Sequence, residues 1–288
     1  MSRISLVIQT CILLGFFTCN SNKQDSSIPR ERRIISLSPH ITEIIYALNQ
    51  EADLVGVTDY CSYPPAATKK EKIGGLLNPN IEKIVSLRPT HLFGQPAHEQ
   101  LNIALSPFAL SITMMPNETI EDVQNTIVTI GKILGCENKA QQLVAQINDA
   151  LNFQQKDSTL LNAMLVIGKN SGELKNIMVA GKGTFLDEIW NRVGGLNVYT
   201  DLPGRYETIS LESIFIRDPD IIIIFDPQAS PGIHQGNFTH EWSILDRTKA
   251  FRSNNLYTLG GDYVLIPGPR IIQLAKDLKE VISKSCNE

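Results

Sequence analysis

The stretch NIEKIVSLRPTHLF (Asn80–Phe93) decides the fold, because its pattern returns as SLESIFIRDPDIIIIF (Ser210–Phe225). In both stretches a glutamate is followed by isoleucine two residues later, by proline seven residues later, and then by an apolar run. Asn80 is a favourable N-cap, proline ends a helix, and a short apolar run predicts a buried strand. The two glutamates, Glu82 and Glu212, are 130 residues apart. The pattern therefore predicts a helix–strand unit in each half of the chain, an internal repeat of whole domains.

Strands and helices alternate on both sides of these stretches. The first half predicts strands at 34–37, 54–60, 91–93 and 110–115, with one helix capped by Thr42 and another over Glu82–Leu87. The second half predicts strands at 162–168 and 220–225, with helices at 183–195, after Ser210 and at 267–285. Such alternation predicts parallel sheets covered by helices.

Residues 118–156 interrupt this alternation with helical periodicity alone. Apolar side chains recur at spacings of three and four on both sides of Gly135, with no strand between. We therefore expect an α/β fold of two parallel-sheet lobes joined by one long rigid α-helix. The predicted boundaries are an N-terminal lobe at 33–137, a connecting helix at 138–157 and a C-terminal lobe at 158–288.

The first eighteen residues differ from the rest. Arg3 precedes an apolar run that is too short to span a bilayer, and a polar segment follows Cys19. This order predicts an export signal at 1–18 and a tether at 19–32. Cys19 at the cleavage point resembles the lipidated cysteine of bacterial lipoproteins, so we expect an exported protein of the periplasm or cell surface, held to the membrane through lipid alone.

Composition narrows the partners. Hydrophobic residues make up 42% of the chain and the net charge is −4, so a globular protein is expected and nucleic acid is not a partner. The body of the chain holds an odd number of cysteines, Cys61, Cys136 and Cys286, which leaves their disulfide state open.

Five segments together resemble the class III, helical-backbone periplasmic substrate-binding proteins of iron-chelate and cobalamin ABC importers. They are RIISLSPHITEIIYAL, GVTDYCSYPP, NPNIEKIVSLRPTHL, LESIFIRDPDIIII and PGPRI, and they span residues 33 to 271 in the order of that family. The resemblance implies binding and delivery to a permease dimer, not catalysis, and no resident cofactor. It also implies that Glu82 and Glu212 dock on arginines of the two permease subunits.

The ligand is expected between the lobes, at the carboxyl ends of the strands. Tyr60 is the main candidate, since an aromatic residue in this context lies against the corrin ring in cobalamin-binding relatives. Trp242 is weighed as either core packing or ligand contact, and Arg270 as either a brace of the cleft edge or a ligand contact. The full set of candidate ligand residues is Tyr60, Gln95, Arg205, Tyr206, Trp242 and Arg270.

The ligand class stays open among metal chelates. The DYCSYPP loop favours cobalamin or a related corrinoid, although relatives carry Trp near the positions held here by Leu76, Leu77 and Gln95. A ferric siderophore or haem is the alternative. A direct Zn²⁺ or Mn²⁺ receptor is less favoured, because the five histidines show no strong ligand spacing. An enzyme is disfavoured because nucleophile-elbow, His-Glu-x-x-His and complete phosphate-loop patterns are missing.

Overall fold

The computed structural model describes residues 31–152, 160–170, 173–236 and 240–285, without the side chains of 240 and 241. The described residues from Arg32 onward form one compact unit. The predicted export signal, Cys19, most of the tether and Cys286 lie outside the described residues. At the end of the predicted tether, Arg32 Nε pairs with Asp53 Oδ2 at 2.9 Å, which connects Arg32 to the N-terminal lobe. Within the described residues, no helix is long and apolar enough to cross a membrane.

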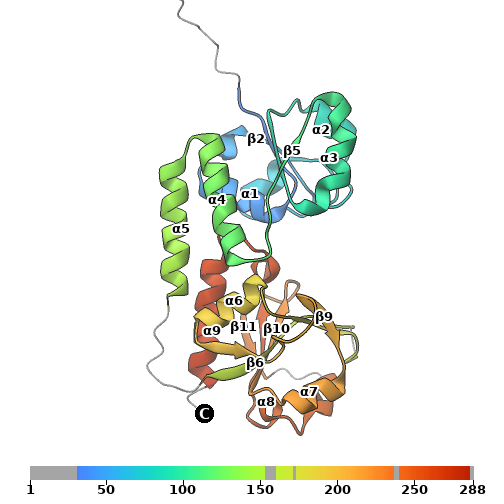
Figure 1. Cartoon of the computed structure of the whole chain (residues 1–288), viewed down its shortest axis with the longest axis vertical. Coiled ribbons are helices and arrows are strands. Elements are labelled where there is room, and N and C mark those ends of the chain that lie inside the picture. Colours follow the sequence, from blue (N-terminus) through green and yellow to red (C-terminus); the bar gives the residue numbers. More distant parts are fainter. Residues whose placement is uncertain (1–30, 153–159, 171–172, 237–239, 286–288) are drawn as a thin grey trace, which may run out of the picture. The chain divides into compact units, whose positions relative to one another are not determined.

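The N-terminal lobe is built on a five-stranded sheet in the order β3-β2-β1-β4-β5 (Figure 1). Every pair of neighbouring strands in it is parallel, as predicted. Its central strand is buried throughout. Helices cover the sheet because each strand must cross over to reach its parallel neighbour. The strands are β1 (Ile34–Ser36), β2 (Leu54–Val57), β3 (Glu71–Lys72), β4 (His91–Gly94) and β5 (Ile112–Met114), and the helices are α1 (Pro39–Ala47), α2 (Ile81–Ser86) and α3 (Glu99–Leu105).

The helix predicted from Thr42 begins earlier. Ser38 is the N-cap of α1 and Pro39 its first residue, a position that suits the fixed φ of proline. Thr42 lies inside the helix instead, fully buried, and its hydroxyl donates to Ser36 Oγ at 2.8 Å. The prediction of Thr42 as the N-cap was therefore wrong by one helical turn.

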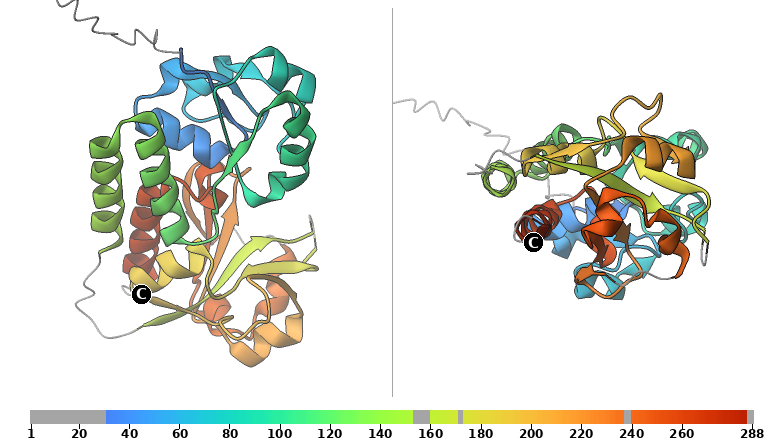
Figure 2. Two further views of the ribbon diagram at one scale, coloured as in Figure 1. Left: turned by 45° about the horizontal axis from the view of Figure 1, so that its top comes forward. Right: turned by 90° about the horizontal axis from the view of Figure 1, so that it is seen from below.

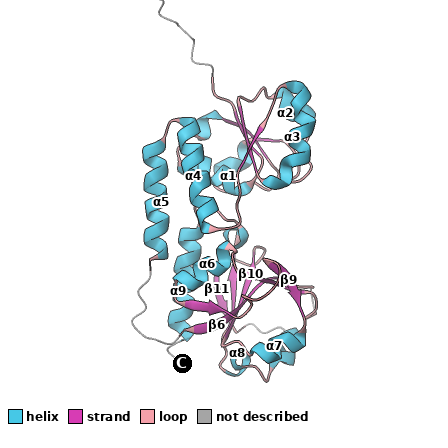
Figure 3. Ribbon diagram, viewed as in Figure 1, coloured by secondary structure: helices cyan, strands magenta, loops and turns pink. Residues whose placement is uncertain are grey.

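The C-terminal lobe has a seven-stranded sheet in the order β11-β12-β10-β6-β7-β9, with β8 also paired to β6. Strands β12, β10, β6 and β8 are mutually parallel, whereas β7, β9 and β11 join antiparallel. Figure 3 shows the strands of this lobe in magenta with helices around them. The strands are β6 (Leu161–Gly168), β7 (Ile177–Ala180), β8 (Gly195–Asn197), β9 (Tyr206–Ile209), β10 (Ile221–Asp226), β11 (Gly232–Gln235) and β12 (Leu256–Gly260), and the helices are α6 (Phe185–Arg192), α7 (Leu211–Arg217), α8 (Lys249–Arg252) and α9 (Ile271–Ser285).

This second sheet corrects the expectation of a wholly parallel sheet in both lobes. Only residues 169–176 separate β6 from β7. A parallel crossover needs about a dozen residues or more, so this short connection forces an antiparallel pair.

The repeated stretches fold alike, as the sequence predicts. Glu82 and Glu212 each occupy the second position of their helix, α2 and α7. Asn80 and Ser210 cap the two helices by accepting a hydrogen bond from the backbone N–H three residues on. A left-handed residue, Arg88 or Asp218, then precedes the proline and the strand.

The lobes are connected by a pair of helices, where the sequence predicted one long helix. Helix α4 (Ile120–Leu134) and helix α5 (Glu137–Leu151) are of equal length, 15 residues each, and pack against each other. They are joined by Gly135, whose φ of +68° suits glycine. Helix α5 was expected to reach residue 157 but ends at Leu151, where its apolar spacing stops and Asn152 is extended.

Together the two helices contact both lobes. The first amide of α4, on Ile120, donates to Glu188 Oε2 of α6 at 2.7 Å, and farther along α4 packs against α1. Helix α5 lies beside α9, where Lys279 Nζ donates to the carbonyl of Ala150 at 2.6 Å (Figure 2). One apolar cluster accordingly runs from the N-terminal lobe through α4 and α5 into the C-terminal lobe.

Candidate functional site

The carboxyl ends of strands from the two sheets face each other. The loop after β2 reaches the segment after β12, where Ser62 Oγ donates to Asp262 Oδ2 at 3.2 Å. The segment after β5 reaches the other lobe as well, since the amide of Phe185 donates to the carbonyl of Glu118 at 2.7 Å. Ligands of open α/β sheets bind outside the carboxyl ends of the strands, so these facing loops form the candidate site.

Arg270 lies at the centre of the contact between the lobes. Its Nε donates to Glu43 Oε2 at 3.0 Å, and a second bond joins Nη2 to the other oxygen of the same carboxylate. Nη1 donates to Asp262, and the guanidinium carbon lies 4.0 Å from the ring centroid of Tyr63. Burial lowers the pKa of Arg270, but the hydrogen bonds that it donates to the two carboxylates outweigh burial and raise that pKa. Two acids thus already neutralise this guanidinium.

The pKa values of the two carboxyl groups that bind Arg270 shift in opposite directions. The Glu43 side chain is only 2% exposed. Burial therefore raises the pKa of Glu43, against the hydrogen bonds and charge of Arg270. Burial also raises the pKa of Asp262, but the bonds from Arg270 and Ser62 outweigh it and hold that pKa below its usual value.

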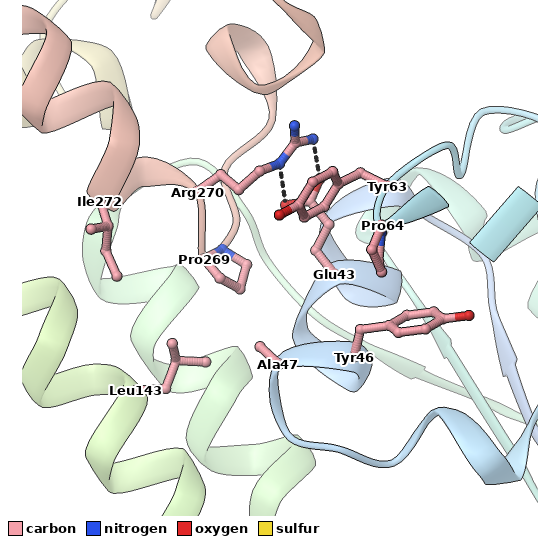
Figure 4. Close-up of a pocket in the computed structure, with 9 residues that line it drawn as sticks. All are labelled: Glu43, Tyr46, Ala47, Tyr63, Pro64, Leu143, Pro269, Arg270 and Ile272. Carbon is pink, nitrogen blue, oxygen red and sulfur yellow. Dashed lines mark hydrogen bonds and ion pairs between the residues drawn. The ribbon is translucent and has the colours of Figure 1, made fainter. Parts of the chain in front are cut away.

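A cavity of about 320 Å³ lies beside this ion pair. Figure 4 shows Arg270 and Glu43 joined by two hydrogen bonds at one end, with the Tyr63 ring over them. The remaining wall is mostly apolar and comes from α1, the Tyr63–Pro64 turn, α5 and the start of α9: Tyr46, Ala47, Pro64, Leu143, Pro269 and Ile272.

Tyr60 lies in the loop that follows β2 and is 65% exposed. The backbone of this loop is tied to the next one, since the amide of Asp59 donates to the carbonyl of Gly74 at 2.9 Å. Leu77, in that second loop, is 68% exposed. Two large apolar side chains are therefore left open to solvent on neighbouring loops at the carboxyl end of the sheet.

Gln95 belongs to a polar group after β4. The backbone N–H of Gln95 donates to His98 Nδ1 at 3.0 Å, so Nδ1 carries no proton. The proton of the neutral His98 ring is therefore on Nε2, which donates to the carbonyl of Leu76 at 2.7 Å. Ser38 and Asn117 approach the side-chain oxygen of Gln95 at 3.5 Å each. Gln95 is half-buried, and its partners fix it between the loops after β1, β4 and β5.

Arg205 and Tyr206 lie where β9 begins, and both are exposed. Burial of the phenol end and the neighbouring carboxylate of Glu118 raise the pKa of Tyr206, whose hydroxyl donates to that carboxylate. Arg205 passes over Gly183, where an added Cβ would lie 3.7 Å from its Nε. The structure thus brings these candidates to the segment that leaves the N-terminal lobe.

Trp242 does not lie at this site. It is 3% exposed and packs in the C-terminal lobe with Leu245, Ala250 and Leu256. Its indole therefore serves the core, and we remove Trp242 from the candidate ligand contacts.

Glu82 and Glu212 are both exposed, each in the first turn of its helix. Backbone and Ser210 hydrogen bonds lower the pKa of Glu212. One turn after these acids the two helices differ: Ile216 on α7 is 84% exposed, whereas α2 has the polar Ser86.

Sequence reasoning missed Glu43 and Glu118. Glu43 interrupts the apolar run Ile41–Ile45, and a lone acid on a buried helix face is a signal that it has a partner. Nothing in the sequence marks Glu118. Among the described residues, no group of three or more His, Cys, Asp or Glu is placed to hold a metal ion.

Comparisons with known proteins agree with this geometry. The sequence profile of the periplasmic binding protein family matches residues 34–263. An uncharacterised ABC transporter substrate-binding lipoprotein of Bacillus subtilis is 29% identical over 279 residues, 91% of this chain and 84% of that protein. A vitamin B12-binding protein of Vibrio parahaemolyticus is 25% identical over 282 residues, 95% of this chain and 98% of that protein.

A solved structure from Staphylococcus epidermidis, described as a possible iron-binding periplasmic solute-binding protein, has the same fold. It matches with a TM-score of 0.74 and 25% identity, over 87% of this chain and 98% of the other. The family profile covers both lobes and the helices between them. The chain therefore belongs to the periplasmic binding protein family, with the fold of its class III members.

Proposed function

We propose that this protein is an extracytoplasmic substrate-binding lipoprotein that captures cobalamin or a related corrinoid between its lobes. The exposed ring of Tyr60, with Leu77 on the next loop, carries the proposal. A large flat ligand buries much apolar area and gains from aromatic contact, and these side chains offer both. The similarity to a vitamin B12-binding protein supports the same ligand class.

The neutralised state of Arg270 also favours a ligand without strong negative charge. Two carboxylates and one guanidinium leave the group around Arg270 net negative. An anionic ligand would have to displace a carboxylate that forms two hydrogen bonds to the same guanidinium, a strong pairing.

A ferric siderophore or haem is the second candidate, and Arg205 favours it. This exposed arginine at the start of β9 is suited to a carboxylate or propionate of the ligand. The similarity to a possible iron-binding protein points the same way.

Binding of candidate ligands to the protein in solution distinguishes the two. Equilibrium dialysis against cyanocobalamin, haemin and ferric siderophores should show saturable binding of the corrinoid, weakened about tenfold or more by Tyr60→Ala, since truncating a central aromatic contact typically costs over 1 kcal/mol. The matched control is Phe108→Ala, another exposed aromatic of the same lobe, located before β5 at the amino end of the sheet. Binding of a siderophore alone, weakened by Arg205→Gln and not by Tyr60→Ala, would overturn the corrinoid proposal.

Delivery follows from the paired acids. Glu82 and Glu212 would each contact a basic residue on one subunit of a permease dimer, and lipid on Cys19 would hold the receptor at the membrane. The lipoprotein relative supports this arrangement. Charge pairs of this kind set orientation and association rate more than affinity.

A further inference from the structure

Five side chains connect the lobes across the facing loops, and we name them the interlobe clamp: Glu43, Ser62 and Tyr63 from the N-terminal lobe, and Asp262 and Arg270 from the C-terminal lobe. Arg270 donates to both oxygens of Glu43 and to Asp262, and Ser62 donates to Asp262. Tyr63 covers the guanidinium at 4.0 Å. Every one of these contacts crosses from one lobe to the other except the bond between Arg270 and Asp262.

The clamp is built for a single spacing of the lobes. A guanidinium that bonds both oxygens of a carboxylate fixes distance and orientation together, because its planar fork allows one geometry. The loop before Arg270 lies against α1, since an added Cβ on Gly268 would be in ordinary van der Waals contact with Glu43 Oε2 at 3.4 Å and with His40 Cα at 3.5 Å.

Moving the lobes apart would take the Glu43 carboxylate away from its cationic partner, whereas Arg270 would keep Asp262 of its own lobe. The Glu43 side chain is 2% exposed and the Arg270 side chain 14% exposed, so neither has water as a ready alternative partner. A buried charge that loses its partner is strongly unfavourable. The clamp therefore opposes opening far more than an exposed ion pair would.

We propose that Glu43 and Arg270 are positioning residues that hold the facing loops at the spacing in which ligand is bound. The effect on ligand rests on the proposed function, but the effect on lobe spacing does not. Breaking the clamp should widen the distribution of distances between the lobes and speed ligand release.

The matched control is Arg217, an arginine with the same kinds of partners inside one lobe. It pairs with Asp201 at 2.7 Å, donates to the carbonyl of Val198, and lies 4.6 Å above the ring of Tyr199. Loss of this arginine should lower stability without changing the spacing of the lobes.

The test measures the distance between spin labels at Ile103 on α3 and Ile216 on α7, both exposed, in the full chain without ligand. Labels attached through an encoded keto amino acid leave the cysteines untouched. We expect Arg270→Gln and Glu43→Gln to broaden the distance distribution and Arg217→Gln to leave it as in the parent. Release of bound cyanocobalamin should accelerate about tenfold in Arg270→Gln and Glu43→Gln but not in Arg217→Gln, since changes within one binding site act mainly on dissociation.

An unchanged distribution in both clamp variants, with a thermal shift like that of Arg217→Gln, would overturn the proposal. If neither clamp variant folds, Tyr63→Leu decides instead, because it removes a ring that is 42% exposed and leaves no buried charge unpaired. It should broaden the distribution to a smaller degree, and no broadening would again reject the clamp. If the protein binds no corrinoid but Arg270→Gln still broadens the distance distribution, the proposed ligand is refuted and the proposed clamp is supported.

Discussion

His40 is a buried histidine that stays uncharged in the folded protein. Its Nδ1 lies 2.6 Å from Ser38 Oγ, and among the described residues its Nε2 has no hydrogen-bond partner. Burial, with a smaller contribution from His98, lowers the pKa of His40 to about 3. The imidazole is therefore neutral in the folded protein at any pH where the protein works.

This shift predicts loss of stability in mild acid. The unfolded chain binds a proton at His40 below its ordinary pKa of about 6.5 and the folded chain does not, so stability is full above that pKa and falls by about 1.4 kcal/mol per pH unit toward pH 3. Chemical denaturation at pH 7 and pH 4.5 should show a smaller loss in His40→Gln than in the parent. The same measurement on His98→Gln provides a comparison with a second histidine, because burial lowers the pKa of His98 as well as that of His40. An equal loss in His40→Gln and the parent would contradict this account.

At the scale of single residues, the sequence predicted which residues lie at the facing loops better than it predicted which residues they contact. Arg270 and Tyr60 were predicted from the resemblance of their segments to the family, and both lie at the facing loops. The pairing of Arg270 with Glu43 joins residues 227 positions apart, and no local pattern encodes it. Trp242 is of a residue type that can contact a ligand, but the packing of the whole lobe decides whether its indole is buried, and the sequence does not show that packing.

At the scale of elements, the contact between α4 and α5 depends on one glycine. A Cβ added to Gly131 would lie 2.4 Å from the Cβ of Ala140, closer than two carbons can approach. The two helices therefore pack at a distance that only small residues allow, and Gly135 makes the turn between them. This close contact keeps the two helices together as one unit.

Gly131→Ala should destabilise the protein by about 1–3 kcal/mol through overpacking, although alanine is favoured over glycine by about 1 kcal/mol in a helix. Adding Ala140→Gly should restore the space and recover part of the loss, a coupling that denaturant titration of the four members of the cycle would measure. Gly131→Ala that stabilises the protein would mean that the helices move apart freely.

Periodicity found both of these helices and the break at Gly135, but not their arrangement. The same apolar spacing suits one long helix or two helices side by side. What decides is that α4 starts against α6 of the other lobe, where Glu188 accepts from the amide of Ile120. The antiparallel strands β7, β9 and β11 were not predicted as strands at all. Strands β9 and β11 contain no apolar run that would identify them, and their pairing depends on connection length and packing.

At the scale of the whole molecule, a continuous apolar cluster and a polar clamp restrain the same motion. The cluster passes through α4 and α5, and the clamp joins the loops at the carboxyl ends of the sheets. Lobes held in this way are expected to move little when ligand binds, unlike receptors whose lobes close widely on a hinge. Release of ligand then calls for an outside force on both lobes, which gives a permease contact on each lobe a physical purpose.

The repeated acids predict where that force acts. Glu82→Ala with Glu212→Ala should leave ligand affinity unchanged, because both side chains are exposed on helices away from the facing loops, and should abolish uptake through a reconstituted importer. The matched control is Glu99→Ala with Glu137→Ala, which removes exposed acids from the first turns of α3 and α5 outside the repeat. Each single variant should lose part of the uptake, with a stronger effect at low salt, since exposed charge pairs are screened by salt. Normal uptake by the double variant, or loss of ligand binding in it, would show that the repeat reflects only the shared helix–strand fold of the lobes.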